Sequence, residues 1–189
     1  MKTLIIHPKD SSTDFLEPIY ANIPTENKTL ITGGVTLSEV NELIKSHDEV
    51  VFCGHGSFMG LFSVGQFKDS DQLGFIINDE TSGLLINKKK IISIWCYASM
   101  YAQFFELTNT FSTGMFISEK CESVALGFND IAEPEIEENN ICFAKELGTL
   151  IHLSPLEIYN QFQVGAYSEL VKTNPISAYN FSRLYCSEN

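Results

Sequence analysis

The sequence predicts an α/β fold, in which helices pack on both faces of a doubly wound, mostly parallel sheet. Short apolar runs rich in β-branched residues alternate with helical patterns along the chain. Continuous apolar runs of this length are typical of strands buried on both faces, as in a parallel sheet. The alternation of strand and helix predicts that successive strands join one sheet with helices between them.

Five apolar runs are the predicted strands of this sheet. They cover residues 3–6, 29–32, 50–53, 91–95 and, with the weakest pattern, 115–118. The first four end close to a proline, a glycine pair, a glycine and a cysteine, where the chain is expected to leave the sheet. Residues 57–78 are rich in Gly and Phe and interrupt the alternation. There we expect a loop with a small hairpin formed by residues 60–64 and 74–78.

Capping signals mark the predicted helices. Thr36 and Glu39 form a capping box, and the apolar residues that follow fall on one helical face. Ser154 and Asn174, each followed by proline, are typical N-caps of two later helices. A further helix is predicted over residues 99–109, and its expected core residues are Tyr101, Phe104, Phe105 and Leu107.

Length and composition predict one globular domain that spans residues 1–189. We expect the core sheet within about residues 1–120 and a helical C-terminal part at about residues 139–186. The 44% hydrophobic and 19% charged residues exclude a disordered chain, a collagen-like fibre and a coiled coil. No apolar run is long enough to span a bilayer, and the apolar patch at residues 4–6 is too short for a signal peptide. Nothing in the chain is therefore expected to direct export.

Charge and cysteine content restrict the partners. Twenty-four acidic and 12 basic residues give a net charge of −12, and the acidic stretch at residues 133–138 is predicted to be an exposed connector. Such a surface repels phosphate groups, so we expect neither nucleic acid nor a membrane as a partner. Five cysteines without a C-x-x-C motif do not indicate a zinc ribbon or a redox site. We expect reduced thiols in a cytoplasmic compartment and leave the oligomeric state open.

Two of the predicted strands end in residues that could carry chemistry. In an open α/β sheet, sites form outside the carboxyl ends of the strands. The strand over residues 50–53 leads to His55, and the strand over residues 91–95 leads to Cys96. A histidine and a cysteine are therefore expected at the same edge of the sheet, as a cysteine nucleophile and its base require. His7, which precedes a proline, is expected to have a structural role.

The residues around these two positions resemble those of clan CD cysteine peptidases, which include caspases, gingipains, clostripain, legumain, separase and the CHAT-domain peptidases. Val-Val-Phe-Cys-Gly-His-Gly at residues 50–56 is similar to the clan's strand with a His-Gly motif. Ile-Ile-Ser-Ile-Trp-Cys at residues 91–96 is similar to its hydrophobic strand followed by the catalytic cysteine. The resemblance covers at most residues 1–120 and implies a caspase-like sheet. The chain has Trp95 and Tyr97 beside the cysteine and lacks the caspase Gln-Ala-Cys-x-Gly signature, so the family within the clan stays open.

The resemblance implies a peptidase mechanism. Cys96 would attack a peptide carbonyl to form a thioester, and His55 would act as general acid and base. The backbone N–H groups of Gly56 and Cys96 would form the oxyanion hole. The helix that follows the cysteine is expected to favour its thiolate. The expected partner is a peptide or protein substrate, and this chemistry requires no metal or organic cofactor.

The resemblance also implies which segments line the substrate pocket: the loop after the first strand, the loop after the His-Gly motif, and segments beyond the cysteine. Candidates in these segments are Asp14, Ser57, Phe58, Met59, Asp79 and Tyr97. An acidic residue in the pocket, for which Asp14 is the first candidate, would select Arg or Lys by charge pairing. Asp14 could equally be a helix N-cap, and Phe58 and Met59 could serve packing alone.

Three alternatives stay open. The first is a catalytically idle caspase-like scaffold or binding protein, because a fold does not fix a function. The second is a non-proteolytic cysteine hydrolase or an amidotransferase, although these usually place the nucleophile in a Gly-x-Cys-x-Gly turn and the base after it. The third is nucleotide binding at Gly33-Gly34, for which a plain turn is the stronger interpretation because the Walker and dinucleotide motifs are missing.

Overall fold

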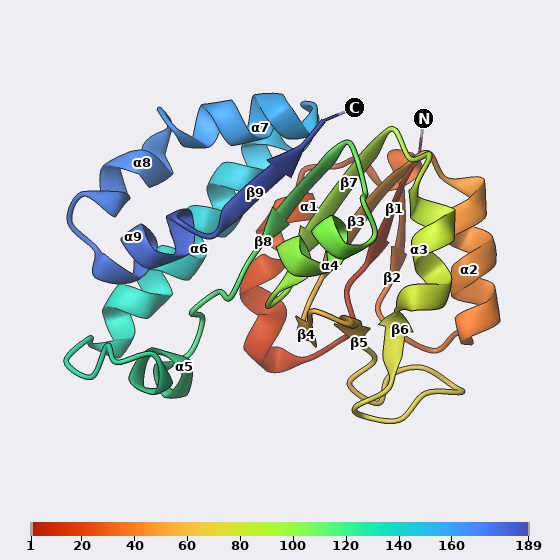
Figure 1. Cartoon of the computed structure of the whole chain (residues 1–189), viewed down its shortest axis with the longest axis horizontal. Helices are drawn as coiled ribbons and strands as arrows, with labels where there is room; N and C mark the ends of the chain where they lie inside the picture. The colour runs from red at the N-terminus through yellow and green to blue at the C-terminus, as the bar shows by residue number, and fades with distance from the viewer. Residues whose placement is uncertain (1, 189) are drawn as a thin grey trace.

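A computed structural model describes residues 2–188, with a six-stranded sheet at the centre (Figure 1). The strand order is β2-β1-β3-β7-β8-β9; the first five strands run parallel, and β9 is antiparallel to β8. The strands are β1 (Thr3–Ile6), β2 (Lys28–Ile31), β3 (Glu49–Cys53), β7 (Lys90–Ile94), β8 (Thr110–Thr113) and β9 (Leu184–Ser187). The predicted α/β class with a mostly parallel sheet is confirmed.

The central strands build two apolar cores, one on each face of the sheet. Val50 and Ile91 belong to one core, whereas their chain neighbours Val51 and Ile92 belong to the other. All four side chains are fully buried. Because both faces are covered, nearly every position in these strands is apolar, and this produces the continuous runs seen in the sequence.

Helices cover both faces of the sheet (Figure 1). Over one face lie α2 (Leu37–Ser46), α3 (Asp79–Leu85) and α4 (Ala98–Phe104); over the other lie α1 (Pro18–Ala21), α6 (Glu133–Leu150), α7 (Pro155–Phe162) and α8 (Ala166–Val171). The remaining helices are α5 (Lys120–Ala125), α9 (Pro175–Phe181) and the short 3-10 helices η1 (Ser11–Leu16) and η2 (Thr25–Asn27). Thr36, Ser154 and Asn174 are the N-caps of α2, α7 and α9, as predicted.

A second, three-stranded antiparallel sheet follows β3. It consists of β4 (Gly56–Ser57), β5 (Gly60–Phe62) and β6 (Phe75–Ile77), and β4 and β5 form a tight hairpin. The antiparallel pairing of β5 with β6 agrees with the predicted hairpin of residues 60–64 and 74–78, whereas β4 was not predicted. The hairpin begins directly after His55, so its position depends on the carboxyl end of β3.

The fifth parallel strand differs from the prediction. The sequence predicts a strand over residues 115–118, but β8 lies earlier, at Thr110–Thr113. Its Thr110, Ser112 and Thr113 are polar and fully buried. A strand with this composition has a weak hydropathy signal, because its interior position depends on the neighbouring strands rather than on its own apolar content.

The C-terminal part also departs from expectation. The sequence predicts helices there, but the chain returns to the sheet as β9, a short edge strand that is mostly half-buried. The acidic stretch at residues 133–138 is not a connector but the start of α6, where Pro134 and the acidic residues suit a helix N-terminus. Phe104, an expected core residue, is 80% exposed, since α4 ends at this residue. Within residues 2–188, no helix has the length and apolar character needed to cross a membrane.

Candidate active site

The structure brings His55 and Cys96 to neighbouring positions at one edge of the sheet. Strands β3 and β7 are parallel partners, and Cys53 lies opposite Ile94 in their register. His55 therefore lies two residues after Cys53, and Cys96 lies two residues after Ile94, the register partner of Cys53. The two side chains line the same small cavity, of about 20 Å³, together with residues from the β1 loop and from the segment after β8.

His55 is held by a hydrogen-bond chain from the loop after β1. Its Nε2 lies 2.6 Å from Ser12 Oγ, and Ser12 Oγ donates to Asp10 Oδ1 at 2.7 Å. Hydrogen bonds from the Ser12 backbone and side chain lower the pKa of Asp10 below its usual value, so this carboxylate is ionised and accepts the hydroxyl proton. Since Ser12 has one hydroxyl proton, the imidazole proton lies on Nε2. Nδ1 is then the basic nitrogen of His55.

Cys96 lies in a much less polar environment. Its Sγ is 3.6 Å from the carbonyl oxygen of Phe116 and 4.0 Å from Glu122 Oε1. Burial, with a smaller contribution from the nearby Glu122 carboxylate, raises the pKa of the Cys96 thiol to about 11. The expectation that the following helix favours a thiolate is therefore not met. Helix α4 has only seven residues, and desolvation outweighs its dipole.

A tight turn joins β7 to α4 immediately after Cys96. Tyr97 has a φ of 68°, in the left-handed region that bulky residues seldom occupy. The turn is fixed by hydrogen bonds from Tyr97 N to Gly114 O at 3.0 Å and from Ala98 N to Trp95 O at 3.1 Å. A strained residue next to a candidate nucleophile is consistent with a functional position, because surrounding contacts must maintain it.

Gly56 lies against the side chain of Trp95. A Cβ at this position would be 2.3 Å from Trp95 Cδ1 and 2.5 Å from Gly60 O, so only glycine fits. Trp95 Nε1 also donates to Ser57 O at 3.0 Å. These contacts fix the hairpin after His55 to the residue before Cys96. The sequence gives no sign of this packing role, because it depends on how two distant segments meet.

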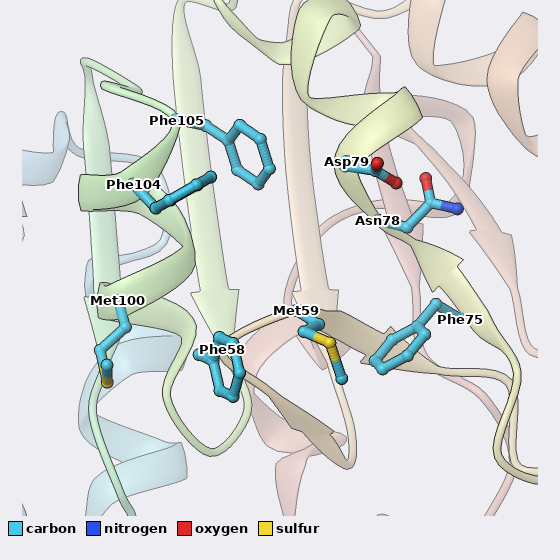
Figure 2. Close-up of a pocket in the computed structure, with 8 residues that line it drawn as sticks. All are labelled: Phe58, Met59, Phe75, Asn78, Asp79, Met100, Phe104 and Phe105. Atoms are coloured by element: carbon cyan, nitrogen blue, oxygen red, sulfur yellow. The ribbon is translucent and has the colours of Figure 1, made fainter.

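The predicted substrate-pocket residues lie in separate places. Phe58, Met59 and Asp79 line a cavity of about 450 Å³ (Figure 2). Tyr97 lines a different cavity, of about 420 Å³, between α4 and the chain around α9 and β9. Ser57 Oγ accepts a hydrogen bond from Met59 N at 3.1 Å and so supports the hairpin turn. Asp14 is an exposed residue of η1 and lines neither of these cavities.

Two residues that position His55 were given no role by the sequence. Asp10 and Ser12 follow β1, and β1 is the neighbour of β3. Their position after a strand was a usable signal, since loops after neighbouring strands meet at the same edge. His7 fits its predicted structural role: it is buried, with ring nitrogens 2.8 Å from Tyr20 Oη and 3.1 Å from Thr13 Oγ1. Burial lowers the pKa of His7 to about 4, so it is neutral at pH 7.

The nucleotide-binding alternative gains no support at Gly33-Gly34. The Gly34 amide donates to Gln66 O at 2.8 Å, and a Cβ on Gly33 would be 2.6 Å from the same oxygen. The glycines thus serve a close backbone approach within the chain. Among residues 2–188, no three His, Cys, Asp or Glu residues are grouped so that they could hold a metal ion.

Comparisons with protein-family models, with curated proteins and with solved structures found no significant match.

Proposed function

We propose that the protein is a cysteine peptidase with a caspase-like arrangement of its sheet, in which Cys96 is the nucleophile and His55 the general acid and base. The observation that carries the proposal is the register of β3 and β7, which places both residues on one cavity at the carboxyl edge of the sheet. The substrate is a peptide or protein.

The reaction begins when Cys96 Sγ attacks the carbonyl carbon of the scissile bond. His55 Nδ1 takes the thiol proton and then donates it to the leaving amine, which leaves a thioester on Cys96. Water attacks the thioester, His55 takes the water proton and returns it to the sulfur, and the carboxylic acid departs. Because burial keeps the thiol protonated, the proton moves during the attack and not before it.

The backbone around Gly56 supports an oxyanion-hole role. Phe62 N donates to His55 O at 2.8 Å, so these two residues form a hydrogen-bonded pair of the hairpin. Hydrogen-bonded and non-hydrogen-bonded pairs alternate along an antiparallel ladder. Gly56 is therefore in a non-hydrogen-bonded pair with Leu61, and its N–H points away from β5. In the proposal this N–H and that of Cys96 bind the developing oxyanion.

The second candidate is an idle scaffold with the same fold. Two observations favour it: the raised pKa of the Cys96 thiol, and the cavity of about 20 Å³ at the dyad, which is too small for a peptide. A catalytic cycle therefore requires the side chains around Cys96 to move when substrate binds. A scaffold requires no such movement.

Cleavage of a mixed peptide library separates the two candidates. We expect products from the wild-type protein and none from Cys96→Ala. Cys142→Ala is the matched control, because Cys142 is also a partly buried thiol with a raised pKa but lies on α6. Cys142→Ala should give the wild-type products. Absence of products from all three proteins would reject the peptidase, and equal products from all three would assign the cleavage to a contaminant.

A further inference from the structure

A cavity of about 450 Å³ lies between α4 on one side and the start of α3 on the other (Figure 2). The tip of the β4–β5 hairpin closes its lower end in this view. Its volume is within the range of ligand-binding pockets. Its lining is mainly aromatic and thioether, with two polar residues at the start of α3: Phe58, Met59, Phe75, Met100, Phe104 and Phe105, with Asn78 and Asp79.

The apolar side chains of this cavity are exposed to an unusual degree. Phe104 is 80% exposed, Phe58 56%, Met59 51% and Met100 50%. Exposed apolar residues that occur singly need no explanation, but a group of them around a hollow marks a binding surface. Two phenylalanines and two methionines here thus contribute little to the core of the protein.

The walls of the cavity continue the two segments that carry the dyad. Phe58 and Met59 follow His55 in the hairpin, and Met100 follows Cys96 in α4. The hydrogen bond from Trp95 Nε1 to Ser57 O holds the two segments together. The cavity is thus linked, along the chain and through this hydrogen bond, to the segments that hold His55 and Cys96.

The charged residues in the segments that line the cavity are acidic. The segments that line it, residues 56–62, 75–85 and 97–107, contain Asp79, Glu80 and Glu106 but no Lys, Arg or His. The whole chain has a net charge of −12, so a second copy would be repelled from this face. Charge complementarity instead favours an occupant that combines an apolar group with positive charge.

We propose that this cavity binds an aromatic side chain of a peptide whose flanking residues are basic. The inference rests on the proposed peptidase function and specifies its substrate class. The aromatic group fills the space between α4 and the hairpin, and Asp79 at the rim attracts the neighbouring Lys or Arg of the peptide. The preference comes from this cavity and not from Asp14.

Binding can be measured without turnover by titrating the Cys96→Ala protein calorimetrically. The probes are acetyl-Gly-Lys-Phe-Lys-Gly-amide, the same peptide with Ala for Phe, and the same peptide with Glu for both Lys. We expect the Phe-to-Ala change to weaken binding about tenfold or more, because it removes one buried aromatic side chain. The Lys-to-Glu change should weaken binding by at least a similar factor and reverse the sign of its salt dependence, because salt screens the repulsion of the two Glu residues.

Variants assign the effect to the cavity. Phe104→Ser should weaken binding of the Phe peptide about tenfold, whereas Val164→Ser, at a residue that is 75% exposed and does not line the cavity, should leave it unchanged. Asp79→Asn should weaken it roughly threefold. Glu137→Gln is its control, since Glu137 is an exposed carboxylate on α6 that does not line the cavity.

The outcomes distinguish failure of the cavity proposal from failure of the peptidase proposal. Tight binding that follows these variants, without cleavage by the wild-type protein, would support the cavity and reject the peptidase. Equal cleavage of peptides with and without Phe and Lys would overturn the cavity proposal alone. Binding that is unaffected by Phe104→Ser would do the same. A wild-type dimer in sedimentation equilibrium that becomes monomeric in Phe104→Ser would also overturn it, because the occupant would then be a second copy.

Discussion

The ends of β3 and β7 lie side by side, yet His55 and Cys96, which follow them, lie in different environments. At the end of β3, His55 is oriented by Ser12 and Asp10, which leave its Nδ1 as a base. At the end of β7, Cys96 is a desolvated thiol whose pKa is raised to about 11. In the proposed mechanism the base is thus already oriented in the resting protein, whereas the Cys96 thiol loses its proton only during the reaction. Polar contacts govern one half of the site and burial governs the other.

The largest expected effect comes from protonation of His7, which would disturb the loop after β1 that orients His55. His7 contacts Thr13, in the same 3-10 helix as Ser12. Its pKa is about 4 in the folded protein and 6.5 otherwise, so the unfolded chain takes up the proton first as pH falls. The stabilising contribution is complete above pH 6.5 and is lost as pH falls through 4. We expect a loss of roughly 3 kcal/mol in unfolding free energy between pH 7 and pH 4.

Urea denaturation between pH 6.5 and pH 5 isolates this effect, because most carboxylates are still ionised there. His7→Gln should flatten the pH dependence in this range, whatever its absolute stability. His152→Gln, at an exposed position, should keep the wild-type slope. Equal slopes for wild type and His7→Gln would show that His7 is not held neutral.

Gly56→Ala would break the link between the two strand ends. The added methyl group would overlap Trp95 Cδ1 and Gly60 O, so we expect a loss of roughly 1–3 kcal/mol in stability together with lower peptidase activity. Gly83→Ala is the control, because nothing lies within 4 Å of a Cβ there and α3 tolerates alanine. Thermal unfolding of both variants measures the difference. Equal stability of the two would contradict the packing of Gly56 on Trp95.

Removing the Ser12 hydroxyl tests the orientation of the base. Ser12→Ala should lower kcat about tenfold, because His55 loses the group that fixes its ring and tautomer, while KM should change little. Ser12→Thr retains the hydroxyl and should recover most of the rate, and Ser11→Ala is a neighbouring control. A Ser12→Ala enzyme with a wild-type pH profile and kcat would remove Ser12 and Asp10 from the mechanism.

The smallest effect concerns the environment of the thiol. Glu122→Gln keeps one acceptor oxygen for the backbone N–H groups of Ser118 and Glu119 but removes a negative charge near Sγ. The pKa of Cys96 should fall, and its alkylation by iodoacetamide at pH 8 should become about twofold faster. Glu119→Gln, which leaves Glu122 in place, is the control. A slower reaction in Glu122→Gln would show that the carboxylate acts on Cys96 in some other way.

The sequence predicts an element well where the burial of that element requires a particular pattern of apolar residues. β1, β3 and β7 could be predicted because strands buried on both faces need apolar residues at nearly every position. The meeting of His55 and Cys96 could be expected from the rule that the ends of parallel strands share an edge. β8 was misplaced because its buried threonines and serine are polar, and β9 was missed because an edge strand needs little apolar content.

Features that depend on two loops meeting could not be predicted. The bond between Ser12 and His55 joins loops after different strands, and the contact of Gly56 with Trp95 depends on the path of the hairpin. The raised pKa of Cys96 results from burial by Phe116 and its neighbours, which arrive from the segment after β8. These contacts join segments that are far apart in the chain, so the local sequence cannot predict them.

The central claim, that His55 activates Cys96, is tested most directly by a covalent peptide probe. A peptidyl acyloxymethyl ketone alkylates a cysteine when the sulfur displaces the carboxylate and a base takes the thiol proton. Mass spectrometry of the wild-type protein, His55→Ala and the control His152→Ala gives the rate of Cys96 modification at pH 7. The account predicts a rate at least about 100-fold lower in His55→Ala and unchanged in His152→Ala. Equal rates in all three proteins, or modification confined to the exposed Cys121, would contradict it.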